Sequence, residues 1–289
     1  MHYIIEDLPK GLCNSLWGAL YVYAYALNNN HTVYIPALKE HSNKIEFNEL
    51  INVKKNIFIE NKYPYLNKLL FKVLNIKTKN MDAEFSQFEN LFKIRKINSW
   101  KEILNNSNKD FIINRNYIRS QILPKKNDIN KIKLKFSNDY EILGLHLRGG
   151  DYKNWRKGTF YFDENIFMPF IDDWLNKKDK RKCFIATNEE KWKINLINYF
   201  GDKIITSDNV IQDLWGLSKS NWIIGPPSTF SQFASFWNNT PIRFILKKDD
   251  YQKLTLPKSY IIALNIFSSG SKLSGHQNGL DFIIKGKYA

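Results

Sequence analysis

Residues 142–152 read ILGLHLRGGDY, an apolar strand that ends directly on charged residues and a pair of glycines. A parallel strand of this kind places the residues that follow it at the carboxyl edge of a sheet, where open α/β folds bind ligands. Glycines let the backbone approach a phosphate closely, and the Arg148 guanidinium can grip two phosphate oxygens in a fork. The stretch therefore favours a nucleotide diphosphate site. The alternative is that His146 and Arg148 lie on one strand face and pair with surface carboxylates.

A second informative segment lies near the N-terminus. Residues 11–16 read GLCNSL, follow an apolar start and open an aromatic-rich run of small residues through Leu27. Residues 32–35 read TVYI, a pattern typical of a strand. Together these stretches predict a strand–loop–helix–strand unit.

A third segment lies downstream. Residues 222–225 read WIIG and predict a strand, residues 226–231 form a turn rich in Pro and Ser, and an aromatic helix is predicted from Gln232 onward. Ser228, Thr229 and Ser231 would then lie at a helix N-terminus, where backbone N–H groups favour anions.

The three segments together resemble the fucosyltransferase superfamily, most closely the bacterial α1,2-fucosyltransferases of glycosyltransferase family 11. The resemblance spans most of the chain and keeps the order of three family motifs: Gly-x-Gly-Asn-Gln, His-x-Arg-Arg-Gly-Asp-Tyr and Ser-x-Phe-Ser. Three departures stand out, because Cys13, Ser15 and Gly149 replace a glycine, a glutamine and the second arginine of these motifs. The last change removes one cationic contact or leaves it to another residue, and it weakens the case for the familiar acceptor linkage.

The resemblance implies a GT-B-like α/β fold with two facing Rossmann-like domains and mostly parallel sheets. Alternating strand and helix patterns after residue 180 agree with a parallel sheet. We expect an N-terminal, acceptor-side domain over residues 1–138 and a C-terminal, GDP-sugar-binding domain over residues 139–289. The lysine- and asparagine-rich stretch from Pro124 to Asn138 would form the polar boundary between them.

The resemblance also implies a reaction: inverting transfer of fucose from GDP-fucose to a glycan hydroxyl, without a covalent intermediate. Arg148 would stabilise the charge that grows on the leaving diphosphate. His146 would help to seat the donor, and Asn14 would reach the reacting sugar or phosphate from the other domain. The alternative for Asn14 is a turn residue that caps a helix beginning at Ser15.

The resemblance implies further donor contacts. Asp208 and Asp213 follow a short predicted strand, where the family tends to place nucleoside contacts, although Asp213 would also suit a helix N-terminus. The complete set expected to bind the donor is Gly11, Cys13, His146, Asp208, Asp213, Ser228, Thr229, Phe230 and Ser231.

The residues after Arg148 have open roles. Asp151 could orient the Arg148 guanidinium, cap the next element or act as the base for the acceptor hydroxyl, and Asp163 and Glu189 are further candidates for that base. Trp155 and Arg156 are expected on the acceptor side, where they could stack on or grip a sugar. The alternative is an aromatic loop that packs on its own domain.

The charge of the chain is strongly positive, with 43 Lys and Arg against 28 Asp and Glu. Clustered cations would indicate nucleic-acid binding, but these are scattered among asparagines and isoleucines and accompany no RNA- or DNA-binding motif. The scatter fits a low-G+C genome. A functional use of the charge would be peripheral contact with an anionic membrane surface that carries lipid-linked acceptors. We therefore expect a GDP-sugar donor and a glycan acceptor as partners, and no nucleic acid.

Cysteines and apolar runs suggest where the protein works. Cys13 and Cys183 are the only cysteines, which argues against a disulfide framework. No apolar run reaches the roughly 20 residues that cross a bilayer. No Asp-x-Asp pair or histidine spacing suggests a metal, and no cofactor is implied. We expect a cytoplasmic, metal-independent enzyme that acts in the synthesis of a surface polysaccharide or glycoconjugate.

Two rival functions stay open at this point. The first is a related enzyme that uses another GDP-activated sugar. The second is a non-catalytic relative that binds acidic glycan or nucleic acid through its basic surface.

Overall fold

The computed structural model describes part of the chain in detail: residues 2–5, 10–30, 32–35, 38, 41, 45–47, 94–97, 113–114, 116–124 and 126–248. The chain divides into two compact units, the first running to Leu123 and the second beginning at Pro124. Helix α6 (Lys126–Lys133) therefore falls in the second unit, ahead of the predicted limit at residue 138. The sequence predicts a terminal strand pair or a tail for residues 256–289, and a role in shaping the acceptor side for residues 45–122. All of the first stretch and most of the second lie outside the described residues.

The first unit contains a small parallel sheet in the order β2-β1-β4. Its connection from β1 (His2–Ile5) through α1 (Leu12–Asn28) to β2 (Thr32–Tyr34) confirms the predicted strand–loop–helix–strand unit. The third strand is β4 (Ile94–Ile97). A separate pair of short strands joins β3 (Ile45–Phe47) to β5 (Ile122–Pro124).

The second unit is built on a five-stranded sheet in the order β10-β9-β6-β7-β8, and every pairing is parallel. The chain runs outward from β6 through β7 to β8, then returns to the other side of β6 for β9 and β10. The connections that follow β6 and β9 therefore leave in opposite directions, which makes the carboxyl ends of these neighbours the topological switch point. The strands are β6 (Glu141–Leu147), β7 (Arg181–Thr187), β8 (Ile204–Thr206), β9 (Trp222–Gly225) and β10 (Ile242–Phe244).

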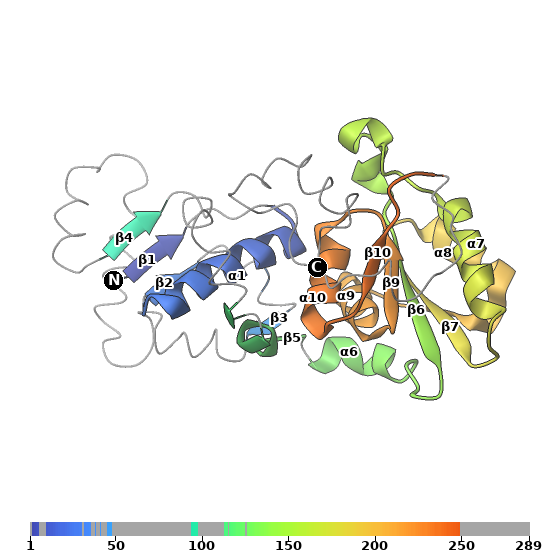
Figure 1. The fold of residues 1–289 in the computed structure, drawn as a ribbon, viewed down its shortest axis with the longest axis horizontal. Helices are drawn as coiled ribbons and strands as arrows, with labels where there is room; N and C mark the ends of the chain where they lie inside the picture. The colour runs from blue at the N-terminus through green and yellow to red at the C-terminus, as the bar shows by residue number, and fades with distance from the viewer. Residues whose placement is uncertain are drawn as a thin grey trace. The chain divides into compact units, whose positions relative to one another are not determined.

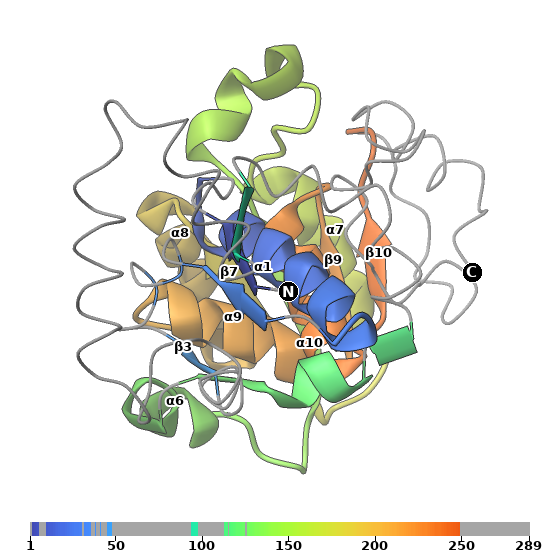
Figure 2. The same cartoon turned by 90° about the vertical axis from the view of Figure 1, so that its left-hand side faces the viewer.

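Helices cover both faces of this sheet (Figure 1). On one face α7 (Glu164–Leu175) and α8 (Glu190–Phe200) pack against β6, β7 and β8. On the other, α9 (Val210–Lys219) and α10 (Thr229–Asn238) lie side by side (Figure 2). Successive side chains of a strand point to opposite faces, so this layering decides which residues of β6 face which helices.

An apolar core fills the space between the sheet and helices α7 and α8. Leu143, Leu145 and Leu147 of β6 pack there with aromatic side chains of α7 such as Phe170 and Trp174. Each large side chain that is fully buried in this way contributes about 1.5–3 kcal/mol to folding. The alternate β6 residues, Gly144 and His146 among them, therefore belong to the α9 and α10 face.

The α9 and α10 face is packed closely enough to require glycines. A Cβ at Gly216 of α9 would come within 2.3 Å of the Phe184 ring, and one at Gly144 would come within 2.7 Å of Ser220 Oγ. These glycines thus let α9 and the residue after it pack closely against the sheet. On the same face, Phe230 at the start of α10 lies next to His146.

The predicted starts of two helices were wrong. α9 begins at Val210 rather than Asp213, because the Asn209 side chain accepts hydrogen bonds from the first free N–H groups of the helix. α10 begins at Thr229 rather than Gln232, because Ser228 caps it in the same way. The lysine- and asparagine-rich stretch at residues 124–138 contains α6, and its role as the boundary between domains stays a prediction. None of the helices in the described part of the chain is long and apolar enough to cross a membrane.

Candidate functional site

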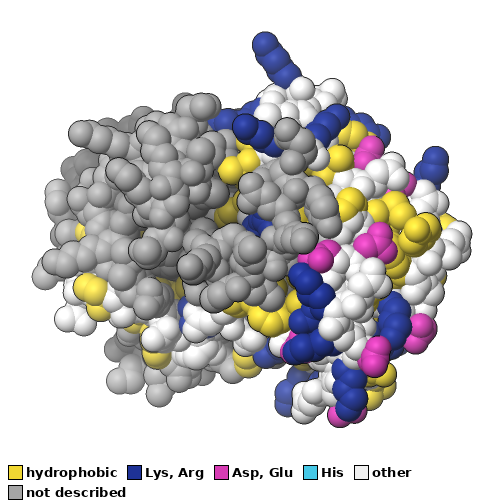
Figure 3. All heavy atoms as spheres, turned by 45° about the vertical axis from the view of Figure 1, so that its right-hand side comes forward, with side chains coloured by type: hydrophobic (Ala, Val, Ile, Leu, Met, Phe, Trp, Pro, Cys, Tyr) yellow, Lys and Arg dark blue, Asp and Glu magenta, His cyan; other side chains and the backbone are white. Residues whose placement is uncertain are grey.

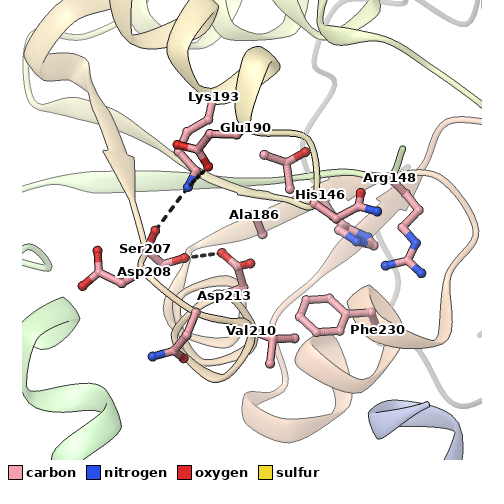
Figure 4. Close-up of a pocket in the computed structure, with 13 residues that line it drawn as sticks. His146, Arg148, Ala186, Glu190, Lys193, Ser207, Asp208, Val210, Asp213 and Phe230 are labelled. Carbon is pink, nitrogen blue, oxygen red and sulfur yellow. Dashed lines mark hydrogen bonds and ion pairs between the residues drawn. The ribbon is translucent and has the colours of Figure 1, made fainter. Parts of the chain in front are cut away.

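A pocket of about 360 Å³ opens at the carboxyl edge of the five-stranded sheet (Figure 4). Its wall is assembled from the ends of β6, β7 and β8 and the starts of α8, α9 and α10. The lining residues are His146, Arg148, Ala186, Thr187, Asn188, Glu190, Lys193, Ser207, Asp208, Asn209, Val210, Asp213 and Phe230. Five residues predicted to bind the donor or the leaving group are among them: His146, Arg148, Asp208, Asp213 and Phe230.

Arg148 lies at one side of this pocket, in the loop that follows β6 (Figure 4). Its Nη2 is 2.8 Å from Asp151 Oδ1, and the two side chains are 34% and 62% exposed. Its Cζ lies 5.7 Å from the centre of the Tyr152 ring. The Nε atom is buried and has no hydrogen-bond partner among the described residues, so this N–H group is free to donate to a bound anion.

The glycines after Arg148 are held by the loop that follows β7. The Gly149 N–H donates to Asn188 Oδ1 at 2.9 Å, and the Gly150 N–H donates to Glu189 Oε1 at 2.8 Å. A Cβ at Gly149 would come within 2.2 Å of Glu189 Cγ. Where the resembled family has a second arginine, this chain therefore packs the side chain of a glutamate over a glycine.

His146 lies between Arg148 and Ala186 in the pocket wall (Figure 4). Burial, together with the nearby Arg148 charge, lowers the pKa of His146 to about 3, so the ring is neutral at physiological pH. The ring lies 5.2 Å from the ring of Phe230, and its Nδ1 is buried without a partner in the described residues. A neutral imidazole in this position can exchange hydrogen bonds with a ligand but cannot add positive charge.

The neighbouring strand accommodates His146 with a glycine. A Cβ at Gly225 of β9 would come within 2.8 Å of the His146 carbonyl oxygen and 2.9 Å of its Cβ. Both contacts involve atoms that cannot rotate away. Any side chain at position 225 would therefore displace His146 from the pocket wall.

Asp213 lies on the side of the pocket away from Arg148 (Figure 4). Burial raises its pKa to about 7, and the hydrogen bond from the Ser207 hydroxyl and the Lys193 charge only partly oppose this effect. Lys193 Nζ is 2.7 Å from Glu190 Oε2 and 3.5 Å from the Ser207 carbonyl oxygen. This side of the pocket therefore combines a buried carboxyl that can ionise near neutral pH with a nearby lysine.

Asp208 lies on the same side of the pocket as Asp213, and its backbone forms part of the turn into α9. Its N–H donates to Gln212 Oε1 at 2.9 Å, which closes the turn into α9. The starts of α9 and α10, ten residues each, both lie at the pocket, and N–H groups at helix starts favour anions.

Ser228 and Ser231, both predicted to bind the donor, support the start of α10. Ser228 Oγ accepts from the Phe230 N–H at 3.2 Å, and the fully buried Ser231 hydroxyl donates to the Ser228 carbonyl at 3.3 Å. Thr229 is the first residue of the helix. Direct contacts of Ser228, Thr229 and Ser231 with a donor stay predictions.

The three candidate bases all have partners already. Asp151 pairs with Arg148, Asp163 accepts from the Asn165 N–H at the start of α7, and Glu189 accepts from the Gly150 N–H. These contacts show what each carboxylate holds in place. A catalytic role for Asp151 stays a prediction.

Trp155 and Arg156 lie in the same loop, outside the pocket lining. The Trp155 ring is 4.8 Å from Tyr152 and 5.6 Å from Phe160, and Arg156 Cζ is 5.6 Å from the Trp155 ring. The loop thus packs on its own unit, as the alternative reading proposed. A contact with an acceptor stays a prediction for both residues.

The N-terminal candidates belong to the first unit. Gly11 precedes α1 with φ of 92°, a conformation that favours glycine. Asn14 lies inside the first turn of α1 and donates from Nδ2 to the Lys10 carbonyl at 2.9 Å, so the alternative of a cap for a helix starting at Ser15 was wrong. Cys13 is buried. The roles of these three residues at a donor site stay predictions.

Sequence reasoning missed part of the pocket wall. Asn188 follows a buried strand just as Arg148 does, and Asn209 precedes a helix, so both carried a recognisable signal. Lys193 carried none, because its position one turn into α8 is ordinary for an exposed lysine. Among the residues that the structure describes, no group of His, Cys, Asp and Glu could hold a metal ion.

No protein-family model and no curated protein sequence matches this chain. Solved structures of similar fold include the NodZ α1,6-fucosyltransferase soaked with GDP-fucose, with a TM-score of 0.51 and 15% identity over 91% of this chain and 99% of that one. The fucosyltransferase NodZ from Bradyrhizobium has a TM-score of 0.52 and 14% identity, over 84% of this chain and 94% of that one. POFUT1 in complex with GDP-fucose has a TM-score of 0.51 and 10% identity, over 85% and 98%. This chain therefore has the GT-B-like α/β fold of fucosyltransferase structures, which confirms the predicted fold class.

Proposed function

We propose that this chain is an inverting glycosyltransferase that moves fucose from GDP-fucose to a hydroxyl of a glycan acceptor, in the synthesis of a surface polysaccharide or glycoconjugate. The observation that carries the proposal is the convergence of His146 and Arg148 at the end of β6, Asp213 of α9 and Phe230 of α10 on one pocket at the switch-point edge of the sheet. Two solved structures of similar fold were obtained with GDP-fucose.

The Arg148 side of the pocket suits the diphosphate. Negative charge grows on the leaving diphosphate as the glycosidic bond breaks, and donors already aimed at that charge lower the barrier. Arg148 brings a guanidinium with a free Nε–H, and the nearby start of α10 brings backbone N–H groups. In this proposal they supply the positive charge that Mg²⁺ provides in metal-dependent glycosyltransferases.

The Asp213 side suits the base. Guanine presents two adjacent N–H donors on its pairing edge, and a carboxylate accepts both. Uracil and cytosine do not present that pair of donors. Asp213, with Asp208 beside it, would therefore select GDP, and the neutral His146 would hydrogen-bond to the nucleoside or a phosphate.

The remaining steps rest on the acceptor hydroxyl. It would attack the anomeric carbon as the diphosphate leaves, which inverts that centre without a covalent intermediate, and Asp151 is our candidate to take its proton. Asn14 is proposed to reach the donor from the first unit. Trp155 and Arg156 are proposed to contact the acceptor.

In this proposal the positive net charge of the chain does not serve to bind nucleic acid. On the face of the second unit that Figure 3 shows, Lys and Arg side chains are spread out, with Asp and Glu among them. Such a distribution does not favour nucleic acid as the partner. Peripheral contact with an anionic membrane surface, and a cytoplasmic location, remain part of the proposal.

The first experiment is calorimetric titration with GDP, UDP and CMP of the wild-type protein and of Arg148→Ala. GDP alone should bind, and the variant should lose about 2–3 kcal/mol, roughly 30- to 150-fold in Kd, as expected for a charge-assisted contact. Arg156→Ala is the matched control, because Arg156 is a nearby arginine outside the pocket lining. This variant should bind GDP as tightly as the wild type does.

Other outcomes would redirect the proposal. Binding of GDP without turnover of GDP-fucose, but with turnover of a different GDP-sugar, would identify another donor. If no nucleotide binds, or if Arg148→Ala behaves like the wild type, the motif is structural. A basic binding protein would then be the better reading, with affinity that ignores nucleotide identity and falls steeply with salt.

A further inference from the structure

The Tyr152 hydroxyl joins the two loops that meet at the switch point. Tyr152 belongs to the loop after β6, and its hydroxyl donates to the Pro227 carbonyl at 2.7 Å, in the loop between β9 and α10. The side chain is buried, and burial raises its pKa to about 12, so the hydroxyl stays protonated and remains a donor. Arg148 lies in the first of these loops, and the second leads directly into the cap of α10 at Ser228.

The ring of Tyr152 is fixed from several directions. The Tyr152 N–H donates to the Gly149 carbonyl at 3.1 Å, which closes a turn around the two glycines. The Arg148 guanidinium lies over the ring at 5.7 Å, and the Trp155 ring stacks on it at 4.8 Å. Trp155 is in turn packed on Phe160. The ring therefore has one orientation, and that orientation aims the hydroxyl at Pro227.

We propose that Tyr152 is a positioning residue that holds Arg148 and the start of α10 in one fixed arrangement around the donor diphosphate. This role rests on the proposed function. The two groups come from different strands, and a shared ligand group binds both well only if their separation is already correct. Without the hydroxyl, the two loops can shift independently by the fraction of an ångström that such sites do not tolerate.

The competing explanation is an ordinary core tyrosine whose hydroxyl happens to satisfy a buried carbonyl. Such a residue would loosen the whole pocket when it is changed. A positioning residue would instead weaken the diphosphate contacts and spare the nucleoside contacts, because Asp208 and Asp213 lie on the other side of the pocket (Figure 4). Comparing GDP with guanosine separates the two explanations.

The test is Tyr152→Phe, which keeps the ring and removes only the hydroxyl. We expect the Kd for GDP to rise roughly 5- to 20-fold, the effect of losing one well-placed hydrogen bond, while the Kd for guanosine stays within about twofold. Tyr161→Phe is the matched control, because this tyrosine ends the same loop, packs on Trp192 and makes no hydroxyl hydrogen bond to a described residue. It should change neither Kd.

Amide hydrogen exchange provides a second readout. In Tyr152→Phe, exchange should accelerate both in residues 149–158 and in residues 228–231, with the rest of the sheet unchanged. Equal losses for GDP and guanosine, or faster exchange in 149–158 alone, would overturn this inference while leaving the proposed function standing. A wild-type protein that does not bind GDP would overturn the proposed function, and this role would fall with it.

Discussion

The Arg148 side and the Asp213 side of the pocket carry their charges in opposite ways. Arg148 is 34% exposed and pairs with an aspartate that is 62% exposed, so solvent screens the pair. Asp213 is buried beside Ser207 and Lys193, and burial raises its pKa to about 7. On the first side the charge is permanent, and the exposed ion pair between Arg148 and Asp151 contributes little to stability. On the second side the charge depends on pH.

This contrast matches the two parts of the proposed ligand. A diphosphate is always charged and is best met by a permanent cation and by backbone N–H groups. A nucleobase is neutral, and a carboxyl that ionises only when donors face it avoids holding an unpaired buried charge in the empty pocket. Variants on the two sides should therefore respond differently to pH, packing and salt.

The largest effect is expected from Asp213→Asn, measured as stability against pH. The pKa of Asp213 rises from 3.8 to about 7 on folding, so between these values the folded protein holds a proton that the unfolded chain has released. Its contribution to stability is complete below about pH 4 and is lost as the pH rises through 7. The asparagine removes this loss, so the variant should gain on the order of 4 kcal/mol over the wild type between pH 4 and pH 8.

Urea unfolding of both proteins from pH 4 to pH 8 measures this gain. His146 has the opposite effect on the pH dependence of stability. Folding lowers its pKa from 6.5 to about 3, so the stability that its neutral form contributes is lost as the pH falls below 6.5. It is present in both proteins and cancels in their difference. A difference that does not change with pH would show that Asp213 is not buried in solution, and the contrast between the two sides would disappear.

The same variant tests the role of Asp213 in binding. If guanine donors face the carboxyl, GDP binding favours its ionised form and releases a fraction of a proton near pH 7. Calorimetry in two buffers of different ionisation enthalpy detects that release. It should be absent in Asp213→Asn.

A smaller effect is expected from Gly149→Arg on the other side, which restores the second arginine of the resembled family. Its Cβ would come within 2.2 Å of Glu189 Cγ, so Glu189 must swing away and give up the Gly150 N–H. Crowding of this kind costs about 1–3 kcal/mol. Thermal or chemical unfolding measures the loss.

The double variant Gly149→Arg with Glu189→Ala is the control for this clash. Removing the glutamate side chain frees the space, so the double variant should recover most of the stability, and Glu189→Ala alone should lose little. Equal stability of Gly149→Arg and the wild type would mean that the glutamate does not occupy this space in solution.

The site was predictable from the sequence only in part. His146 and Arg148 were predicted to lie at the carboxyl edge of a sheet because they end an apolar strand, whereas Asp208 and Asp213 were assigned to the same donor site by the family resemblance. Their ionisation could not be predicted, since the lowered pKa of His146 and the raised pKa of Asp213 both come from burial. Sequence patterns do not show which charged residues the tertiary structure will bury.

Tertiary packing could not be predicted from the sequence either. The fit of Glu189 over Gly149 joins residues from two loops, and neither one signals the other in the sequence. Helix α7 was not predicted, and it contains Pro169, a residue type that normally argues against a helix interior. The starts of α9 and α10 were readable in principle, since Asn209 and Ser228 are strong N-caps.

The smallest stability effect is expected from Asp151→Asn. Exposed ion pairs contribute about 0.2–1 kcal/mol, so unfolding should change by no more than that, and the change should shrink as salt is added. The informative measurement is kcat. If Asp151 only orients Arg148, kcat should fall a few-fold, and GDP binding should weaken in proportion. If Asp151 is the base for the acceptor hydroxyl, kcat should fall about 10²- to 10⁴-fold with GDP affinity nearly intact. Asp163→Asn serves as the comparison, since that carboxylate caps α7 and should affect stability more than kcat.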